Sequence, residues 1–331
     1  MYFSFIIPVY NRPDEINELL DSLLSLRYDK DFEVVVVEDG STIPCKNVVD
    51  NYADRLPISY YFKPNSGPGA SRNYGMNIAK GNYFIILDSD CLIPPDYLQE
   101  VERFLQAEYV DCFGGPDAAH PTFSNVQKAI NQTMTSVLTT GGIRGASEKL
   151  GKFQPRSFNM GLSKDAFEAS KGFGKIHPGE DPDLSIRLWK MNYKTALIPN
   201  AYVFHKRRID WEKFYKQVNK FGKARPILNK RYPEYRKLTY WFPSVFICGF
   251  LLALALLAFN SYWLFYLYIM YFTLLFLESL IQTKSFKIAF LTIIATFIQF
   301  FGYGAGFLYS YFLLNIKKEV AEKAMPEMFF K

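Results

Sequence analysis

Tyr83-Phe84-Ile85-Ile86-Leu87-Asp88-Ser89-Asp90 is the stretch of sequence that decides the fold. Five apolar residues lead directly into an Asp-x-Asp pair. The run is too short for a typical helix and too apolar for a half-exposed strand, so it predicts a central strand of a parallel sheet. Ligands of open α/β sheets bind outside the carboxyl ends of the strands, which makes Asp88 and Asp90 candidate site residues. Taken alone, an Asp-x-Asp pair more often only closes a strand in a turn.

Further apolar runs on both sides of this stretch predict the rest of the sheet. They alternate with amphipathic segments, and this alternation is typical of a doubly wound α/β fold. The expected strands are residues 2–9, 33–38, 58–63, 83–90, 109–114, 158–162 and 201–205. Asp39 and Asp88 follow different strands, so we expect the two carboxylates to converge at one edge of the sheet.

Carboxylates that lie close together repel each other unless a cation neutralises them. A small number of oxygen ligands favours Mg²⁺ or Mn²⁺, shared between the protein and substrate phosphates. The glycine-rich stretch at residues 65–73 looks like a dinucleotide fingerprint, but Arg72 replaces its last glycine and it follows a third strand. A Rossmann cofactor site is therefore excluded. A helix that begins here beside Arg72 can still receive a phosphate.

Two later segments offer polar groups whose role the sequence leaves open. Glu180 and Asp181 stand just before a helix that we expect to begin at Pro182. Either they cap this helix or one of them is a general base, and the segment alone favours capping. His205 follows the last strand and precedes three basic residues, so it is a candidate ligand for pyrophosphate or metal, whereas the other two histidines are expected in ordinary loops. Residues 139–145 predict either a mobile loop over a substrate or a solvated connection.

The composition changes sharply near Trp241, because residues 242–314 are almost free of charge. Three stretches there approach the roughly 20 residues that a helix needs to cross a bilayer, namely residues 242–259, 262–281 and 290–314. Gly302, Gly304 and Gly306 interrupt the third stretch. Three spans are favoured over a third stretch that is re-entrant or interfacial. Glu278 is costly in lipid and is expected to face another helix or an interface.

The net charge of +6 comes from one segment. Residues 205–237 hold twelve Lys and Arg against three Asp and Glu, which leaves the rest of the chain slightly acidic. A basic run before an apolar region favours a membrane surface over nucleic acid and places this side in the cytoplasm. Residues 210–225 predict a helix with an aromatic stripe that ends at Pro226. This helix is either packed in a core or lies on anionic lipid.

Five motifs stand in the order and spacing of a known family. They are Ile6-Ile7-Pro8-Val9-Tyr10-Asn11, Val37-Glu38-Asp39-Gly40-Ser41, Gly69-Ala70-Ser71-Arg72-Asn73, Leu87-Asp88-Ser89-Asp90 and Gly179-Glu180-Asp181. Over residues 1 to about 225 the chain resembles a family 2 glycosyltransferase with a GT-A fold, which is a doubly wound, Rossmann-like and mostly parallel α/β sheet. Its apolar C-terminal segments are similar to those of bacterial membrane-bound members that build surface polysaccharides or glycolipids.

The resemblance implies a role for each candidate residue. The nucleotide-binding residues would be Pro8, Tyr10, Asn11, Asp39, Arg72 and Asp88. The metal ligands would be Asp90 and Asp88, to which His205 is added from its position alone. The catalytic residues would be Asp181, as the general base, and Glu180 beside it. Asn159 and Met160 would lie on the acceptor side.

The implied activity is that of an inverting, metal-dependent glycosyltransferase, with Mn²⁺ or Mg²⁺ as the cofactor. It would move a sugar from a nucleotide-diphosphate donor, with a UDP-sugar favoured, to a hydroxyl of a lipid-linked or membrane-associated acceptor. One alternative is a catalytically silent, nucleotide-sugar-binding subunit of a membrane complex. A processive polysaccharide synthase is the other, although Gln217 does not begin the Gln-x-x-Arg-Trp motif of that class.

The expected organisation follows from the motifs and the composition together. It comprises a glycosyltransferase domain (1–225), a basic juxtamembrane linker (226–241), a transmembrane region with two or three helices (242–316) and a polar tail (317–331). We expect the chain in the bacterial inner, cytoplasmic membrane with its catalytic domain facing the cytoplasm. The partners would be membrane lipids, the donor and the acceptor.

Overall fold

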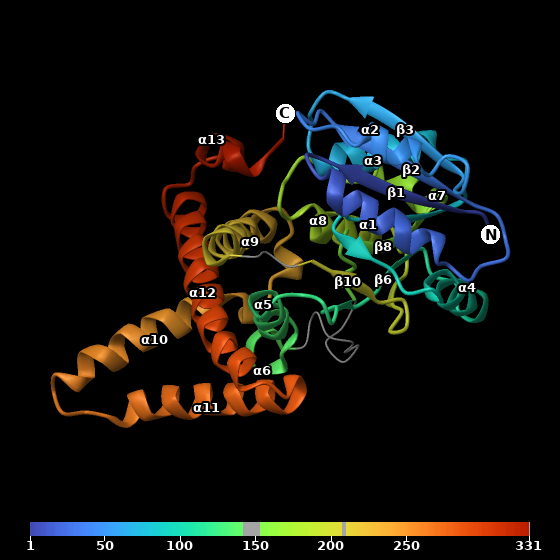
Figure 1. The fold of residues 1–331 in the computed structure, drawn as a ribbon. Coiled ribbons are helices and arrows are strands. Elements are labelled where there is room, and N and C mark those ends of the chain that lie inside the picture. Colours follow the sequence, from blue (N-terminus) through green and yellow to red (C-terminus); the bar gives the residue numbers. More distant parts are fainter. Residues whose placement is uncertain (142–152, 207–209, 331) are drawn as a thin grey trace. The chain divides into compact units, whose positions relative to one another are not determined.

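A computed structural model describes residues 1–141, 153–206 and 210–330 (Figure 1). Contacts divide the chain into two compact units. The sheet unit comprises Met1–His120, Ala146–Lys206 and the C-terminal Phe330–Lys331, and the helical unit comprises Pro121–Gly145 and Arg207–Phe329. Residues 121–141 and 210–225 therefore belong with the C-terminal helices, although they were expected within the first domain.

The sheet unit is built on a seven-stranded sheet in the order β3-β2-β1-β4-β8-β6-β9. Its strands are β1 (Phe3–Val9), β2 (Phe32–Asp39), β3 (Ile58–Lys63), β4 (Tyr83–Leu87), β6 (Cys112–Gly114), β8 (Asn159–Ser163) and β9 (Thr195–Leu197). All pairings are parallel except those of β8, which runs antiparallel to β4 and β6. Every residue of β4 is buried, which confirms the expected central strand and the mostly parallel α/β class.

Helices cover both faces of this sheet because successive strand residues point to opposite sides. In β1, Phe5 and Ile7 belong to one core cluster, which also contains residues of α1 and α4, whereas Ile6 belongs to a second cluster with residues of α3, α7 and α8. The helices of this unit are α1 (Pro13–Leu24), α2 (Lys46–Asp50), α3 (Pro68–Ile78), α4 (Tyr97–Ala107), α7 (Lys164–Ser170) and α8 (Glu180–Lys190).

A second, three-stranded sheet was not predicted. It has the order β5-β10-β7 and consists of β5 (Cys91–Leu92), β10 (Val203–His205) and β7 (Asp117–Ala118). In this sheet His205 lies opposite Cys91, and Val203 lies opposite Asp117. The small sheet therefore carries the residue after Asp90, a histidine and a further aspartate on adjacent strands.

The helical unit contains the three apolar segments. Its helices are α5 (Asn125–Thr135), α6 (Val137–Thr140), α9 (Trp211–Arg231), η2 (Pro233–Tyr235), η3 (Leu238–Trp241), α10 (Phe242–Leu257), α11 (Trp263–Thr283), α12 (Phe286–Tyr311), η4 (Phe312–Ile316), α13 (Ala321–Ala324) and η5 (Pro326–Met328). Among the described residues, three helical segments are long and apolar enough to cross a membrane, namely Leu238–Leu257, Trp263–Thr283 and Phe286–Ile316. Of the loop expected at residues 139–145, Thr139 and Thr140 belong to α6, and residues 142–145 lie outside the described part.

The glycines of α12 do not interrupt it, so that expectation was wrong. They allow close approach of neighbouring helices instead. A Cβ at Gly306 would clash with the carbonyl oxygen of Asn219 in α9, and the Asn219 side chain donates a 3.0 Å hydrogen bond to the carbonyl of Gly302. A Cβ at Gly304 would lie 2.5 Å from Ile247 of α10. Helices α9 and α10 therefore both pack against α12.

Pro226 lies inside α9, which continues to Arg231, so the expected helix end at Pro226 was also wrong. A proline removes one backbone donor from a helix, and packing against α12 and η4 on either side of it compensates here. Asn219 contacts α12 before the proline, and Lys230 donates to the carbonyl of Leu314 after it. The apolar stripe of α9 is used in this packing, since Phe214 and Val218 are buried in a cluster with residues of α5 and α12.

Gly306→Ala should destabilise the helical unit, although alanine is the better helix former by about 1 kcal/mol. The new methyl group would meet backbone atoms of α9. Overpacking of this kind costs about 1–3 kcal/mol. Thermal unfolding of the detergent-solubilised protein is the measurement. Ala305→Leu is the matched control, because Ala305 is exposed on the same turn and should tolerate a larger group. An unchanged melting temperature for Gly306→Ala would contradict the close α9–α12 contact.

Candidate active site

The carboxyl ends of β2, β1 and β4 form one edge of the main sheet. Strand β1 lies between the other two and is parallel to both, so Asp39 and Asp88 reach the same edge, as predicted. Asn11 lies two residues after the end of β1 and has a positive φ of 53°. Its side-chain oxygen accepts hydrogen bonds from the backbone N–H groups of Thr42 (2.8 Å) and Ile43 (3.0 Å). The turn after β1 is thereby tied to the loop after β2.

Two other residues expected at the nucleotide lie in β1 and the turn that follows it. Pro8 is partly buried, and Tyr10 is 50 % exposed. An exposed aromatic ring can stack on a planar ligand.

Asp39 is buried, and several donor groups contact its carboxylate. The backbone N–H groups of Ser66 and Gly67 each donate to it at 2.9 Å, and Lys63 forms an ion pair with it. No motif singled out Lys63. Its position at the end of β3, beside β2, explains the contact.

Arg72 links the two acidic motifs. The guanidinium is buried and donates to Asp88 at 2.6 Å and to Glu180 at 3.3 Å, and it lies over the ring of Phe173. Burial lowers the pKa of Arg72, but the charges of Asp88 and Glu180 outweigh it, so the pKa is raised and the group stays charged. A single cation therefore holds the ends of β4 and α8 together.

Glu180 and Asp181 differ in electrostatic environment although they are neighbours. Burial alone would raise the pKa of Glu180, but His177 at 2.9 Å and then Arg72 lower it to about 2. For Asp181, burial and then the charge of Glu180 raise the pKa. The Oδ1 atom of Asp181 is buried and has no hydrogen-bond partner among the described residues.

Neither residue is the N-cap of this helix. Helix α8 begins at Glu180 and not at Pro182, and its N-cap residue is Gly179. The Glu180 carboxylate accepts the backbone N–H of Gly179 at 2.9 Å, whereas no such bond involves Asp181 Oδ1 among the described residues. Asp181 is therefore a buried carboxylate at a helix N-terminus with one oxygen free to accept a proton. A raised pKa and an available oxygen are the properties of a general base.

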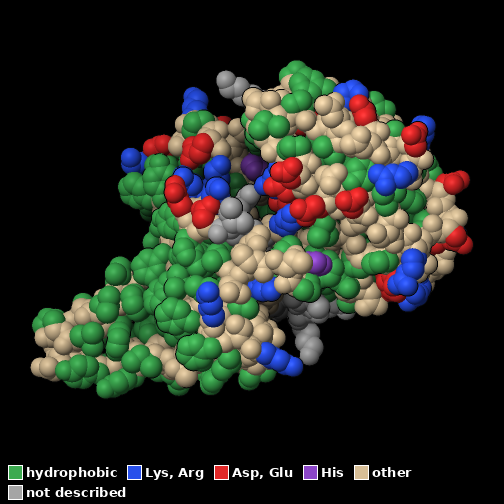
Figure 2. Space-filling view, viewed as in Figure 1, with side chains coloured by type: hydrophobic (Ala, Val, Ile, Leu, Met, Phe, Trp, Pro, Cys, Tyr) green, Lys and Arg blue, Asp and Glu red, His purple; other side chains and the backbone are tan. Residues whose placement is uncertain are grey.

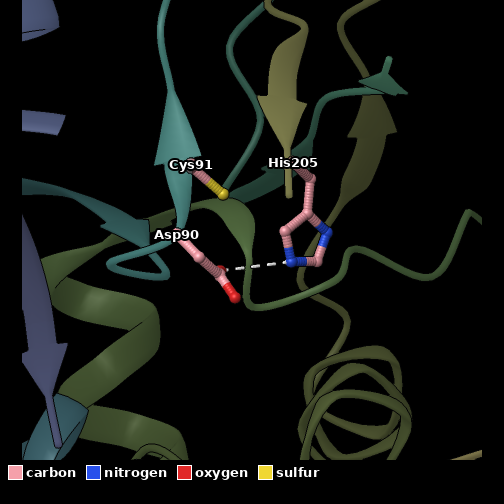
Figure 3. A group of neighbouring side chains, drawn as sticks. All are labelled: Asp90, Cys91 and His205. Atoms are coloured by element: carbon pink, nitrogen blue, oxygen red, sulfur yellow. Dashed lines mark ion pairs between the residues drawn. The ribbon is translucent and has the colours of Figure 1, made fainter. Parts of the chain in front are cut away.

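A second cluster surrounds Asp90 (Figure 3). The Nε2 atom of His205 lies 3.3 Å from Asp90 Oδ1, and Arg12 donates to Oδ2. The imidazole ring stacks on Phe158, with ring centroids 4.8 Å apart, and its Nδ1 lies 3.9 Å from a carboxylate oxygen of Asp117. Burial raises the pKa of Asp90, but the charges of His205 and Arg12 outweigh it and hold the pKa well below its usual range.

The residues around Asp90 fit a divalent cation. Ligand atoms of Asp90, Cys91 and His205 lie within 4.8 Å of one another (Figure 3). Asp90 Oδ1 is buried and makes no hydrogen bond among the described residues beyond its 3.3 Å ion-pair contact with His205 Nε2, and the low pKa keeps the group ionised. A buried, ionised oxygen of this kind suits a cation. Asp88 is not part of this group, because its carboxylate contacts Arg72.

Asn159 and Met160 have no exposed surface. The side chain of Asn159 accepts from Tyr97 at 2.6 Å and donates to the carbonyl of Ala201 at 2.7 Å, so it joins α4 to the loop before β10. Met160 is fully buried in the second core cluster. These two side chains offer no atom to an acceptor, and the structure gives them a packing role instead.

Four residues at the site were missed by the sequence analysis. His177 was expected in an ordinary loop, and Arg12, Lys63 and Asp117 were not selected. Each reaches its partner across the fold or through a short loop. Only the clustering of charged residues near the motifs could have pointed to them.

Comparison with known proteins assigns a family to this part of the chain. The family model described as "Glycosyl transferase family 2" matches residues 4–168. An uncharacterized glycosyltransferase of Rickettsia typhi is 40 % identical over 96 residues, which are 29 % of each chain. The poly(ribitol-phosphate) beta-N-acetylglucosaminyltransferase TarS of Staphylococcus aureus is 36 % identical over 114 residues, 34 % of this chain and 20 % of TarS. The matched region thus spans less than a third of these relatives.

Solved structures share the fold over most of the chain. The mannosyltransferase PcManGT from Pyrobaculum calidifontis, in complex with GDP-Man and Mn²⁺, has a TM-score of 0.58 and 16 % identity, and the match covers 93 % of this chain and 87 % of that one. Residues 1–349 of S. aureus TarS, in complex with UDP-GlcNAc, have a TM-score of 0.50 and 19 % identity, with 93 % and 91 % covered. At these identities the likeness establishes the architecture.

Proposed function

The chain belongs to glycosyl transferase family 2, and from this membership we propose that it transfers a sugar from a nucleotide-diphosphate donor to a hydroxyl of a membrane-associated acceptor. The observation that carries the proposal is the link that Arg72 makes between Asp88 and Glu180, beside Asp181 with its available oxygen. Donor-side and acceptor-side carboxylates are thereby held at one edge of the sheet.

The donor nucleotide would bind where β1, β2 and β4 end. Tyr10 offers an exposed ring for the base, and Pro8 and Asn11 shape the turn that presents it. Asp39 fixes the loop at Ser66 and Gly67 through hydrogen bonds from their backbone N–H groups. This loop would line the nucleotide site beside the strand ends. A UDP-sugar is the favoured donor, and related structures with UDP-GlcNAc and with GDP-Man make both nucleotides worth testing.

Asp90 and His205 would hold the divalent cation, with Mn²⁺ or Mg²⁺ as the proposed ions. When bound, such a cation stabilises the negative charge on the leaving diphosphate. Arg12 lies close enough to contribute a second positive charge at the same place. Preorganised charges aimed at a leaving group are among the largest contributions to catalysis.

Asp181 would act as the general base. Its buried oxygen would take the proton of the acceptor hydroxyl while the hydroxyl oxygen attacks the anomeric carbon. The bond from the anomeric carbon to the diphosphate breaks on the opposite face, so the configuration inverts. Glu180, ionised and held by Arg72 and His177, would keep the pKa of Asp181 raised through its charge.

The acceptor would be lipid-linked, in surface polysaccharide or glycolipid synthesis. Support comes from the three helices that are long and apolar enough to span a membrane and from the basic segment before them. We place the chain in the bacterial inner membrane, with the sheet unit on the cytoplasmic side.

A nucleotide-binding panel tests both the donor site and the role of Asp90. We expect UDP with Mn²⁺ to raise the melting temperature of the detergent-solubilised protein, and expect Asp90→Ala to lose this rise. A ligand at about 100 Kd adds roughly 2.7 kcal/mol of stability. GDP, CDP and dTDP, each with Mn²⁺ and with EDTA, complete the panel.

Asp96→Ala is the matched control, because the Asp96 side chain is 46 % exposed and forms its ion pair with Arg27, away from the cluster. It should keep the metal-dependent rise. If UDP raised the melting temperature of the wild type as much in EDTA as with Mn²⁺, the metal role would be overturned. Nucleotide binding without any transfer to membrane acceptors would favour the silent-subunit alternative.

A further inference from the structure

The segment of residues 125–141, which contains α5 and α6, runs along the second candidate membrane helix. Three hydrogen bonds join this segment to α11, and their order along the two partners is opposite. They are Gln132 Nε2 to Gln282 Oε1 (2.8 Å), Ser136 Oγ to Glu278 Oε2 (2.5 Å) and Tyr271 OH to the carbonyl of Leu138 (3.1 Å). As the segment proceeds, its partners therefore move from the end of α11 toward its middle.

The rise per residue of an α-helix gives the distance along the helix axis that these contacts span. Gln282 is the residue before the last of α11. Tyr271 lies eleven residues earlier, which corresponds to about 16 Å along the helix axis. Helix α12, which starts at Phe286, gives a second, independent measure. Thr133 donates to the carbonyl of Thr292 at 3.2 Å. By the same rise per residue, Thr292 lies about 9 Å inside the start of α12.

The tip of the segment presents apolar side chains. Val137 is 67 % exposed and Leu138 is 37 % exposed. On α11, to which Leu138 is joined through Tyr271, the side chains of Met270, Leu274 and Leu277 are each 45–55 % exposed. Figure 2 shows hydrophobic side chains over most of the visible surface of these helices, with few charges among them. Figure 1 shows α6 beside α11 and α12.

We propose that residues 136–140 enter the hydrocarbon of the bilayer beside α11, as an insertion from the part of the sequence that lies between Asp90 and Glu180. The apolar tip then contacts lipid hydrocarbon. The inference rests on the proposed membrane crossing of α11 and adds an insertion that the hydropathy of the sequence does not reveal. Its depth is set by the bonds to Glu278 and Tyr271.

Several polar groups of the segment have the partners that such a position requires. A backbone group without a partner is strongly unfavourable in hydrocarbon. The N–H of Leu138 donates to the Ser136 hydroxyl, and its carbonyl accepts from Tyr271. The hydroxyls of Thr139 and Thr140 donate to carbonyls of the preceding turn.

The insertion also explains Glu278. A carboxyl group within a span is costly unless another group satisfies it. Ser136 supplies that group, so the expectation that Glu278 faces a neighbouring element is confirmed, and the neighbour is this segment.

Fluorescence of single labelled cysteines in liposomes tests the insertion. Cys45, Cys91 and Cys112 are buried and Cys248 of α10 is exposed, so an NBD-type thiol label on the wild-type protein should report on α10 alone. In a Cys248→Ser background, Val137→Cys places the label at the tip. Asn125→Cys is the matched control, because Asn125 is exposed at the start of the same helical segment.

We expect the label at residue 137 to be quenched by nitroxides on the lipid acyl chains, as at Cys248. Quenching by aqueous iodide should be weaker at residue 137 than at residue 125 by roughly fivefold or more, because water is excluded from the bilayer core. Leu138→Cys is the second variant, in case Val137→Cys does not fold.

A label at residue 137 that behaves like the one at residue 125, while Cys248 reports lipid, would overturn the insertion alone. Aqueous behaviour at Cys248 as well would overturn the membrane crossing, and the insertion with it. The two failures are therefore distinguishable, and neither depends on catalytic activity.

Discussion

Replacement of Asp181 by asparagine is expected to reduce kcat for sugar transfer by about 10³-fold, within the range that general acid–base catalysis supplies. Asparagine has the same shape but cannot take a proton from the acceptor hydroxyl. The affinity for UDP should stay within about twofold, because the role proposed for Asp181 concerns the acceptor. The measurements are radiolabelled sugar transfer to membrane acceptors and a nucleotide titration on the same preparation.

The pH dependence gives a second readout of the same prediction. Burial and the charge of Glu180 raise the pKa of Asp181, so the base is protonated over a wider acidic range than an ordinary aspartate. Transfer should therefore rise with pH as Asp181 ionises, and the acidic limb should disappear from the residual activity of Asp181→Asn. Asp165→Asn, at an exposed aspartate of α7, is the control and should keep the wild-type profile. Normal turnover in Asp181→Asn would remove Asp181 from the mechanism.

Arg72→Met is expected to destabilise the sheet unit by about 3–5 kcal/mol, because it leaves a buried charge without its partner. The arginine side chain is only 4 % exposed, and that of Glu180 is 6 % exposed. Methionine fills part of the volume but restores none of the hydrogen bonds to Asp88 and Glu180. Denaturant unfolding of the full chain in detergent, followed by tryptophan fluorescence, is the measurement.

Two further variants separate charge from shape at Arg72. Arg72→Lys keeps one positive charge but cannot reach both carboxylates in the same way, so its loss should be intermediate. Arg103→Met is the matched control, because the Arg103 side chain is largely exposed where it pairs with Glu100. Such a surface ion pair contributes less than about 1 kcal/mol. Equal stability of Arg72→Met and Arg103→Met would mean that Arg72 does not hold the two motifs together.

Much of the sheet could be predicted because its strands are long and strongly apolar. The stretch that begins at Tyr83 is the buried strand β4, and the alternation of strands and helices predicted the mostly parallel sheet. The three apolar helices followed from length and composition alone. The small sheet was missed because strands such as Cys91–Leu92 are too short to have a period.

The site was predictable at its motifs and not at its counter-ions. Asp88 and Asp90 follow a recognisable strand, so their position at the sheet edge could be foreseen. The contact of Arg12 with Asp90 joins residues 78 apart in the chain, and no local pattern encodes it. Pro226 and the glycines of α12 were misread for a related reason, since tertiary packing overrode their usual effect on helices.

The interleaving of the two units along the chain has a consequence for synthesis on the ribosome. Gln132 and its partner Gln282 are separated by 150 positions in the sequence. Translation at roughly 5–20 residues per second takes on the order of ten seconds to cover that separation. During this interval the segment that contains Val137 and Leu138 has emerged, but the helices that receive it have not. Under the proposed insertion, we therefore expect its apolar tip to need shielding from water until α11 and α12 have been synthesised.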